Sequence, residues 1–455
     1  MPRLVLVSFL GKGASAKENR QRSHLGYQTA RYDFTQLGGA FEETSLFGLA
    51  LLRYLCSRNQ LPNLWLVLGS PQSLWDALVE AVDIDLWSDF EDVLKRVEQA
   101  VRDENPNASR GGGHLTEELL QEWGQTLSRY LHPTQVRCFL IGWSSDRAEQ
   151  ERLWHILHSQ TEPKDHLILD ITHGFRHQPM LTAFMVMLLN RLKQFSALEF
   201  YYGALDMTPR PTRPAEVQGQ VPYQGERETP PTPVLKIDFV NDLVHATEVL
   251  ATYQETGDYE PLADFALHGE VQTQVQNLIF EQRVNKPRLS ALEPALTALT
   301  RFEAPDSLRA SLVPLLQREV ASLREGSLYG RLVRQADKAM EHDNYMVAIP
   351  LLWEAVLSLA CQLTGSGSPE EYRSREVAES RLVEQQDAYL TDHERGILRD
   401  LREVRNAIVH GTRRSERAAV KSALSSKEGM KQLFDQAREI YDRLYRSLPR
   451  GQGER

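Results

Sequence analysis

Residues 170–179 read DITHGFRHQP and place a hydroxyl, an imidazole, a glycine and a guanidinium in one short turn. The turn follows an apolar stretch typical of a buried strand, and Pro179 fits the first turn of the helix expected after it. The N-terminus of a helix at the end of a strand presents free N–H groups to an anion. Gly174 allows a close approach, Arg176 can bind a phosphate through two parallel hydrogen bonds, and Thr172 can donate one. The turn therefore predicts a phosphate site, and the alternative is an ordinary helix start whose arginine faces solvent.

A second polar turn follows the first expected strand, residues 3–10, and reads SFLGKGASA from Ser8. Its glycines and last alanine fit the G-x-G-x-x-A pattern of dinucleotide-binding proteins. That pattern also requires a helix that opens at the glycines and an acidic residue after the next strand, and the sequence offers neither. We therefore reject a nicotinamide site and keep a glycine-rich turn in which Ser8, Lys12 and Arg22 contact a nucleotide.

The third stretch that could do chemistry is RNAIVHG, residues 405–411. Apolar residues recur at helical spacing over residues 397–408 and Gly411 supplies a stop, so His410 is expected at a helix C-terminus. Arg405 and His410 point roughly 140° apart on an ideal helix, which suits a site completed by a second copy. A histidine can move protons at a ribose 2′-hydroxyl, and an arginine can stabilise the charge on a scissile phosphate. By spacing alone, a helix-edge arginine and a histidine that caps the last carbonyls are the commoner arrangement.

Alternating strand and helix patterns must position the first two turns. The expected strands are residues 3–10, 64–69, 136–142, 166–171 and 197–205. The expected helices are residues 43–56, 70–82 with Ser70 or Ser73 as N-cap, 147–159 and 179–192. Continuously apolar strands separated by helices indicate a mostly parallel sheet covered on both faces.

The composition changes after residue 206. Residues 207–234 contain seven prolines and little apolar periodicity, which indicates an extended linker or a long excursion. Beyond them the pattern is helical to the end of the chain. We expect an α/β domain over residues 1–206, a Pro-rich segment and helical connector over 207–330, and an all-helical domain over 331–455.

Charge and cysteine usage limit the class of protein. The 455 residues carry a formal net charge of −10, which argues against a protein that coats nucleic acid but leaves room for a local RNA site. Cys56, Cys138 and Cys361 form neither a zinc pattern nor a disulfide framework, so a reducing cytosol is expected. No carboxylate and histidine cluster resembles a two-metal nuclease, which favours metal-free chemistry. No signal peptide is expected, and the longest apolar run, near residues 180–189, is too short to cross a bilayer.

Together these stretches resemble the CARF–HEPN proteins, ancillary ribonucleases of type III CRISPR systems. The D-x-T-H-G-F-R turn at 170–176 is similar to the hallmark of one branch of the CARF domains in that family. The R-x-x-x-x-H spacing at 405–410 matches the HEPN motif, and residues 243–265 are similar to the helical segment between the two domains. Order and spacing agree over nearly the whole chain.

The resemblance implies a Rossmann-like CARF domain that binds a cyclic oligoadenylate, expected to be cyclic tetra-adenylate, across a two-fold axis. It also implies an all-α HEPN domain, a homodimer or higher homo-oligomer, and metal-independent cleavage of single-stranded RNA without a cofactor. By motif position, the ligand residues would be Ser8, Phe9, Leu10, Gly11, Lys12, Thr172, His173, Gly174, Phe175 and Arg176. The catalytic residues would be Arg405 and His410, with Asn406 as a polar neighbour. Whether Lys12, Thr172 or His173 also helps to cleave the messenger stays open.

Other functions compete with this one. A regulator that senses a cyclic nucleotide through the same domain without catalysis could carry a DNA-binding module, but no convincing helix-turn-helix is found. A helical dimerisation domain in which Arg405 and His410 are only structural would not cleave RNA. A Rossmann-type metabolic enzyme is disfavoured by the missing acidic residue. Trp353 and Leu357 are expected in the helical core, with Glu354 as an ion-pair partner of Arg405.

Overall fold

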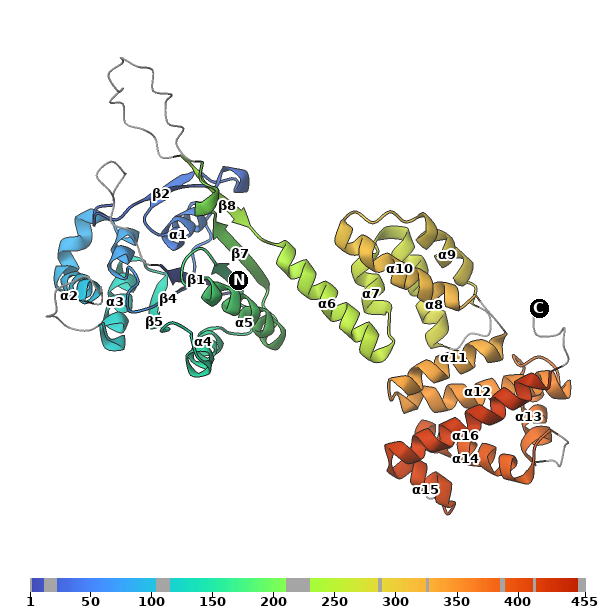
Figure 1. The fold of residues 1–455 in the computed structure, drawn as a ribbon. Helices are drawn as coiled ribbons and strands as arrows, with labels where there is room; N and C mark the ends of the chain where they lie inside the picture. The colour runs from blue at the N-terminus through green and yellow to red at the C-terminus, as the bar shows by residue number, and fades with distance from the viewer. Residues whose placement is uncertain are drawn as a thin grey trace, which may run out of the picture. The chain divides into compact units, whose positions relative to one another are not determined.

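The computed structural model divides the chain into two compact units, Met1–Asn241 and Asp242–Arg455 (Figure 1). It describes residues 2–11, 23–103, 115–209, 230–284, 289–324, 327–384, 389–411 and 415–448. The finer limits expected at residues 206 and 330 stay predictions.

Unit 1 is built on an eight-stranded sheet in the order β3-β2-β8-β7-β6-β1-β4-β5. The strands are β1 Leu4–Leu10, β2 Ala30–Asp33, β3 Phe41–Thr44, β4 Leu64–Gly69, β5 Gln135–Leu140, β6 His166–Asp170, β7 Ala197–Gly203 and β8 Thr232–Lys236. The run β7-β6-β1-β4-β5 is parallel, whereas β8 is antiparallel to β7 and β3 to β2. Numbered in chain order, the five parallel strands follow the Rossmann order 3-2-1-4-5. The expected α/β fold is therefore confirmed, and each of its five strands lies within two residues of the expected bounds.

Helices cover both faces of the sheet (Figure 1). The helices on one face are α1 Phe47–Ser57, α2 Glu91–Asp103 and α3 Glu117–Tyr130, and those on the other are α4 Arg147–Gln160 and α5 His177–Lys193. Short 3-10 helices complete the unit: η1 Thr35–Leu37, η2 Asp76–Ala81, η3 Ile84–Phe90 and η4 Leu205–Met207. The two faces of β1 and β4 are both buried, which is why these strands are continuously apolar.

Two expected helices differ in the structure. The helix expected at residues 43–56 begins only at Phe47, because residues 41–44 pair with β2 as a strand. The helix expected at residues 70–82 is reduced to η2. Ser73 does not cap it: its hydroxyl donates to the Leu10 carbonyl at 2.9 Å and accepts from the Ser70 N–H at 3.0 Å. One of these bonds is local and the other ties Ser73 to the end of β1, so the Ser73 hydroxyl is not used to cap a helix.

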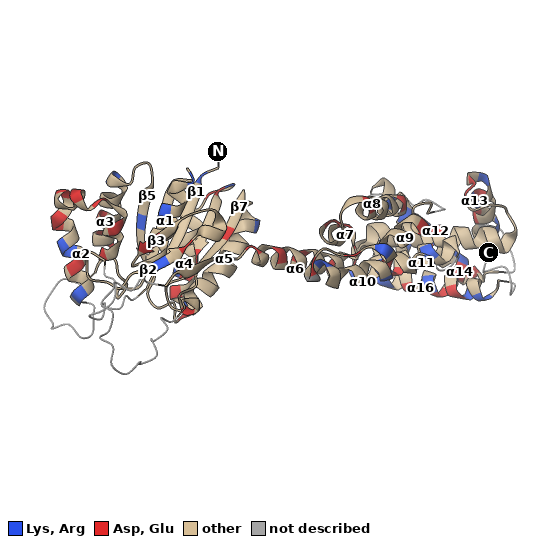
Figure 2. Ribbon diagram, turned by 90° about the horizontal axis from the view of Figure 1, so that it is seen from above, with Lys and Arg blue, Asp and Glu red and all other residues tan. Residues whose placement is uncertain are grey.

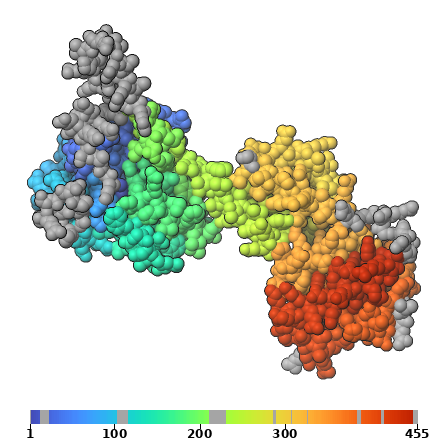
Figure 3. Space-filling model, in the orientation of Figure 1, coloured from blue at the N-terminus to red at the C-terminus, as the bar shows by residue number. Residues whose placement is uncertain are grey.

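Unit 2 is helical throughout its described residues. Its helices are α6 Phe239–Thr256, which begins in unit 1, α7 Glu260–Ala266, α8 Gly269–Arg283, α9 Leu292–Arg301, α10 Ser307–Ser322, α11 Leu328–Glu341, α12 Tyr345–Thr364, α13 Tyr372–Glu379, the π-helix η5 Ser380–Glu384, α14 Asp392–His410, α15 Ala418–Ser425 and α16 Lys427–Arg446. One hydrophobic cluster joins α6 to α10, and another joins α11 to α16. The surface helix α16 crosses the visible face of this unit in Figure 3.

The apolar helix α12 forms the centre of the second cluster. Trp353 and Leu357 are buried there, as expected. By length and hydropathy α12 is the one helix in the described residues that could cross a membrane, and 67% of its apolar window is buried inside the protein. It is longer than the run at residues 180–189 that the sequence analysis singled out. Charged residues are spread over the helices of both units, whereas most positions of the strands are uncharged (Figure 2).

Candidate functional site

The turns after β1 and β6 lie side by side at the carboxyl edge of the sheet. Strand order reverses between these two strands, which is where open parallel sheets bind ligands. The strands pair in parallel, and a side chain on Gly11 would approach Nδ1 of His173 to 3.3 Å. The structure therefore brings residues 8–11 and 172–176 together. Lys12 and the rest of the glycine-rich turn, including Arg22, lie outside the described residues.

Three of the expected ligand residues have side chains in the core. The buried Ser8 hydroxyl accepts a hydrogen bond from the Trp65 indole N–H at 3.1 Å. Phe9 and Leu10 are buried as well. In the described part of this turn only Gly11 is partly exposed, so the strand end can offer a ligand backbone groups rather than side chains.

The His173 side chain links the turn after β6 to Phe47, the first residue of α1, by a hydrogen bond. Its Nε2 accepts a hydrogen bond from the Phe47 N–H at 3.0 Å. Because a backbone N–H can only donate, Nε2 is unprotonated and the neutral imidazole carries its proton on Nδ1. Burial lowers the pKa of His173 to about 4, which keeps the ring neutral. Nε2 is therefore engaged within the fold and is not free for a phosphate.

Asp170 and Thr172 stiffen the base of the turn. The Thr172 N–H donates to Oδ1 of Asp170 at 2.8 Å, and the Thr172 hydroxyl accepts from the Gly203 N–H at 2.8 Å. Burial raises the pKa of the Asp170 carboxyl to about 7, although hydrogen bonds from Thr172 oppose the shift. The absence of a side chain at Gly48 lets α1 pack here, since a Cβ would lie 2.8 Å from the Ser8 hydroxyl. The turn thus has a fixed geometry before any ligand arrives.

The outer part of the turn is open to a ligand. Gly174 is exposed and has φ +90, a conformation that other residues rarely adopt. Arg176 is exposed, and this N-cap residue gives α5 no side-chain cap, whereas the first N–H of α1, at Phe47, is already bound by His173. The N-terminus of α5, the dipoles of the two helices and the guanidinium all favour a negative charge at this edge.

Three residues beside the turn were not foreseen from the sequence. Trp143 lies in the loop between β5 and α4, and its ring stacks on Phe175 with centroids 4.9 Å apart. His177 and Gln178, at the start of α5, hydrogen-bond to that loop. No spacing in the sequence connects Trp143 with residues 172–176, because the two segments meet only through the fold.

A second candidate site lies at the end of α14. The helix starts with a capping box formed by Thr391 and Glu394, and it ends at His410 before Gly411, which has φ +79. The C-terminal end agrees with the sequence pattern, whereas the capping box at the start was not predicted. His410 is exposed at the last turn, and its side chain forms no hydrogen bond or ion pair within the described residues.

Arg405 is held by groups on two helices. Its Nη1 donates to Oδ1 of Asn406 at 3.0 Å, and its Nη2 lies 3.7 Å from Oε1 of Glu354 on α12. The expected ion pair is thus confirmed. The other oxygen of Glu354 forms an ion pair with Arg375 on α13, which the sequence analysis did not foresee. Two guanidinium groups therefore share one carboxylate, which leaves the cluster with a positive charge that an anion could neutralise.

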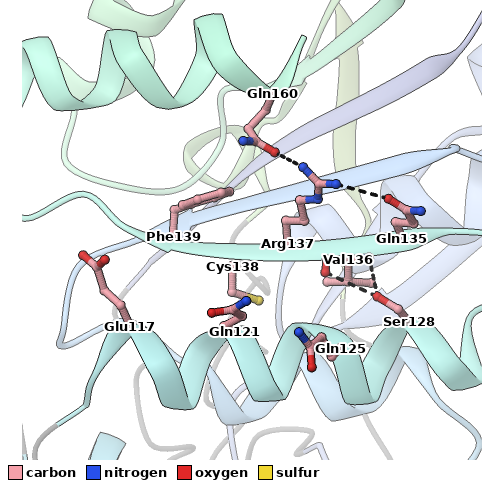
Figure 4. A pocket seen from close by; sticks show the side chains of 10 residues that line it. All are labelled: Glu117, Gln121, Gln125, Ser128, Gln135, Val136, Arg137, Cys138, Phe139 and Gln160. Atoms are coloured by element: carbon pink, nitrogen blue, oxygen red, sulfur yellow. Dashed lines mark hydrogen bonds between the residues drawn. The ribbon is translucent and has the colours of Figure 1, made fainter.

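Two further features of the described part of the chain concern metal binding and surface hollows. No three His, Cys, Asp or Glu side chains there gather in a way that could hold a metal ion. A hollow of about 620 Å³ lies along the outer edge of β5, where Arg137 hydrogen-bonds to Gln160 and Gln135 (Figure 4). None of the expected site residues lines this hollow.

Comparison with known proteins finds a family model that is similar to part of the first unit. Residues 5–204 match the family model described as "CRISPR system endoribonuclease Csx1, CARF domain". The CRISPR-associated protein MJ1674 of Methanocaldococcus jannaschii is 26% identical over 219 residues, which cover 45% of this chain and 31% of that protein. The match thus spans about a third of the length of that curated relative.

Among solved structures, Enterococcus italicus Csm6 bound to cyclic hexa-2′-fluoro-hexa-dAMP is similar over 98% of this chain and 96% of that chain. The TM-score is 0.37 and the sequence identity 11%, a likeness too low to support a functional argument.

Proposed function

We propose that the chain is a CARF-containing ancillary protein of type III CRISPR systems and that it is a ribonuclease activated by a cyclic oligoadenylate. The observation that carries the proposal is the combination, in one chain, of a unit similar to CARF domains with an R-x-x-x-x-H helix end whose histidine is exposed. In this proposal residues 1–206 sense the messenger, residues 207–330 connect, and residues 331–455 form a HEPN domain. The protein works in the cytoplasm as part of antiviral defence.

The messenger site is the carboxyl edge of the sheet. Gly11, Gly174 and Arg176 offer exposed backbone and a guanidinium to phosphates, while Thr172 and His173 hold the turn in place. Lys12 adds a second cation in the proposal. The ligand is a cyclic oligoadenylate, with cyclic tetra-adenylate as the expected ring, and two protomers bind it together.

The reaction is metal-independent cleavage of single-stranded RNA. The ribose 2′-oxygen attacks the adjacent phosphorus, the bond from phosphorus to the 5′-oxygen breaks, and a 2′,3′-cyclic phosphate and a 5′-hydroxyl result. His410 takes the proton from the attacking 2′-hydroxyl and supplies a proton to the leaving 5′-oxygen. Arg405 stabilises the charge on the phosphate. Asn406 and Glu354 orient Arg405. No cofactor takes part.

The ribonuclease site requires a homodimer or higher homo-oligomer. Arg405 and His410 point roughly 140° apart on one helix, so one copy does not direct both at the same phosphate. Two copies of α14 that face each other would place the arginine and histidine of both chains around one RNA strand.

The test is cleavage of a fluorescent single-stranded RNA in EDTA, without ligand and with cyclic tri-, tetra- or hexa-adenylate. We expect one ring to switch cleavage on, and Arg405→Ala and His410→Ala each to abolish it. His393→Ala, an exposed histidine on the same helix, is the control and should cleave normally. Cleavage that continues in His410→Ala would remove His410 from the mechanism.

One observation favours a second function. Arg405 is engaged by Glu354 and Asn406 within a single copy, as a purely structural arginine would be. The chain would then be a sensor of cyclic oligoadenylate with a helical dimerisation domain and no catalysis. Binding of a ring without cleavage of any RNA tested would select this function over the ribonuclease.

A further inference from the structure

An exposed tryptophan lies beside the candidate phosphate turn. Trp143 belongs to the loop between β5 and α4 and remains 45% exposed. Its ring is nearly parallel to that of Phe175, with an interplanar angle of 26° and a centroid separation of 4.9 Å. Phe175 lies between Gly174 and Arg176, so the aromatic pair adjoins the groups that would hold a phosphate.

The aromatic pair is fixed by polar contacts between the two loops. Gln178 is buried, and its side-chain amide donates to the Gly142 carbonyl at 3.1 Å and to the Ser144 hydroxyl at 3.3 Å. Its amide oxygen accepts the Phe175 N–H at 3.1 Å. One side chain therefore connects the loop of Trp143 to the turn of Phe175.

His177 adds a third aromatic ring to the pair. Its Nε2 hydrogen-bonds to the Trp143 carbonyl at 2.7 Å, and because a carbonyl only accepts, this nitrogen carries the proton. The His177 ring lies nearly parallel to Phe175, at 6.1 Å and 21°. The three rings thus form an ordered aromatic surface at the edge of the sheet.

We propose that Trp143, supported by Phe175, is a stacking site for a purine base of the messenger. This inference rests on the proposed function, because it assigns the base that adjoins the phosphate at Gly174 and Arg176. In an oligoadenylate each phosphate adjoins a nucleoside, so a phosphate bound at this turn brings an adenine close to the aromatic surface. Aromatic faces bind bases by stacking without needing complementary hydrogen bonds.

The site is also preorganised. The contacts of Gln178 and His177 order the rings before binding, so less conformational entropy is lost when a base stacks. The alternative partner for the exposed ring is an aromatic or apolar side chain of a second copy, which the experiment separates from a base.

The experiment measures cyclic tetra-adenylate binding to the full-length protein by calorimetry, for wild type, Trp143→Ala and Trp143→Phe. We expect Trp143→Ala to bind about tenfold to a hundredfold more weakly, the range typical of a lost base stack. Trp143→Phe keeps a ring and should stay within a few-fold of wild type. Melting temperature and light scattering on each variant report folding and oligomeric state.

The outcomes are distinguishable. Equal affinity in wild type and Trp143→Ala would overturn the stacking site while leaving the proposed function intact. Loss of dimers in Trp143→Ala with unchanged affinity would assign the ring to a protein contact and also overturn it. A wild-type protein that binds none of the tri-, tetra- or hexa-adenylate rings would overturn the proposed function, and the stacking site with it.

Discussion

At the scale of single residues, burial shifts the pKa values of Asp170 and His173, two residues of one turn, in opposite directions. Burial raises the pKa of Asp170 to about 7, so the folded protein gains stability from the protonated acid at low pH and loses it as pH rises towards 7. Burial lowers the pKa of His173 to about 4, so the neutral ring stabilises the fold above pH 6.5, and that stability is lost as pH falls towards 4. Between these limits the two effects oppose each other.

Replacing Asp170 with asparagine should expose the pH dependence of His173. The amide keeps the shape of the protonated acid but cannot ionise, so the variant should gain stability relative to wild type as pH rises from 5 to 8. Thermal unfolding followed by tryptophan fluorescence measures this, because six of the seven tryptophans lie in unit 1. A difference in melting temperature that is the same at pH 5 and pH 8 would show that Asp170 does not titrate in this range.

We expect the position of the Arg405 guanidinium to depend on the carboxylate of Glu354. Glu354→Gln removes the charge that Arg405 and Arg375 share, so we expect RNA cleavage to fall about tenfold to a hundredfold because the guanidinium that the proposed mechanism requires would be misplaced. Glu379→Gln is the matched control, because Glu379 on α13 pairs with Arg402 on α14 at 2.8 Å, and within the described residues no hydrogen bond or ion pair joins Glu379 to Arg405. Equal cleavage rates in both variants would mean that Glu354 does not position Arg405.

At the scale of elements, α5 begins directly after the turn at residues 172–176. One side of this helix is apolar and is not covered by other described residues. Met180, Phe184, Leu188 and Leu192 recur every four residues, and each is more than half exposed. Figure 2 shows α5 as largely uncharged. An i, i+4 ridge of this kind packs against the same ridge of another helix. Since the proposed function requires a second copy, α5 is where we expect the two messenger-binding units to meet.

Phe184→Glu should therefore weaken the dimer. A charge in the middle of the apolar ridge would have to be buried without a partner, which is costly. Light scattering at micromolar concentration should show a shift from dimer to monomer. Leu61→Glu, which alters an exposed leucine of the same unit outside α5, should stay dimeric. A Phe184→Glu protein that is as dimeric as wild type would move the contact to another surface.

The elements also show what sequence patterns can predict. The five parallel strands were found because both faces of each are buried, which makes their sequences continuously apolar. The strands β2, β3 and β8 were missed because they are four or five residues long and partly exposed, so they lack that pattern. The 3-10 helix η2 was expected as an α-helix because Ser73 and Ser70 looked like caps. Only the tertiary contact of Ser73 with Leu10 reveals their role.

In the two candidate sites as well, only features that are local in sequence could be predicted. The turn at residues 172–176 and the helix end at Arg405 and His410 were recognisable because each is local in sequence. Trp143 and Arg375 were not, because each reaches its site through a contact between distant segments. Even within the recognised turn, the sequence could not show that His173 points at Phe47 rather than at a ligand.

At the scale of the whole molecule, the proposed messenger site and the proposed catalytic site lie in different units of the chain. A messenger activates the enzyme only by binding the active state more tightly than the inactive one. In the proposed site, Arg176→Ala would remove a charged hydrogen bond to the messenger, so half-maximal cleavage should need about tenfold to a hundredfold more cyclic tetra-adenylate, and excess messenger should restore cleavage.

His410→Ala should behave in the opposite way. It should abolish cleavage at every messenger concentration while the dissociation constant for the ring stays at the wild-type value. Titration of both variants, by calorimetry for binding and by fluorescent RNA for cleavage, checks the two halves together. If Arg176→Ala lowered the cleavage rate without changing the messenger concentration required, the turn after β6 would act in coupling rather than in binding. If His410→Ala also lost the messenger, the two sites would not be separable, and the division of labour between the sheet edge and α14 would be wrong.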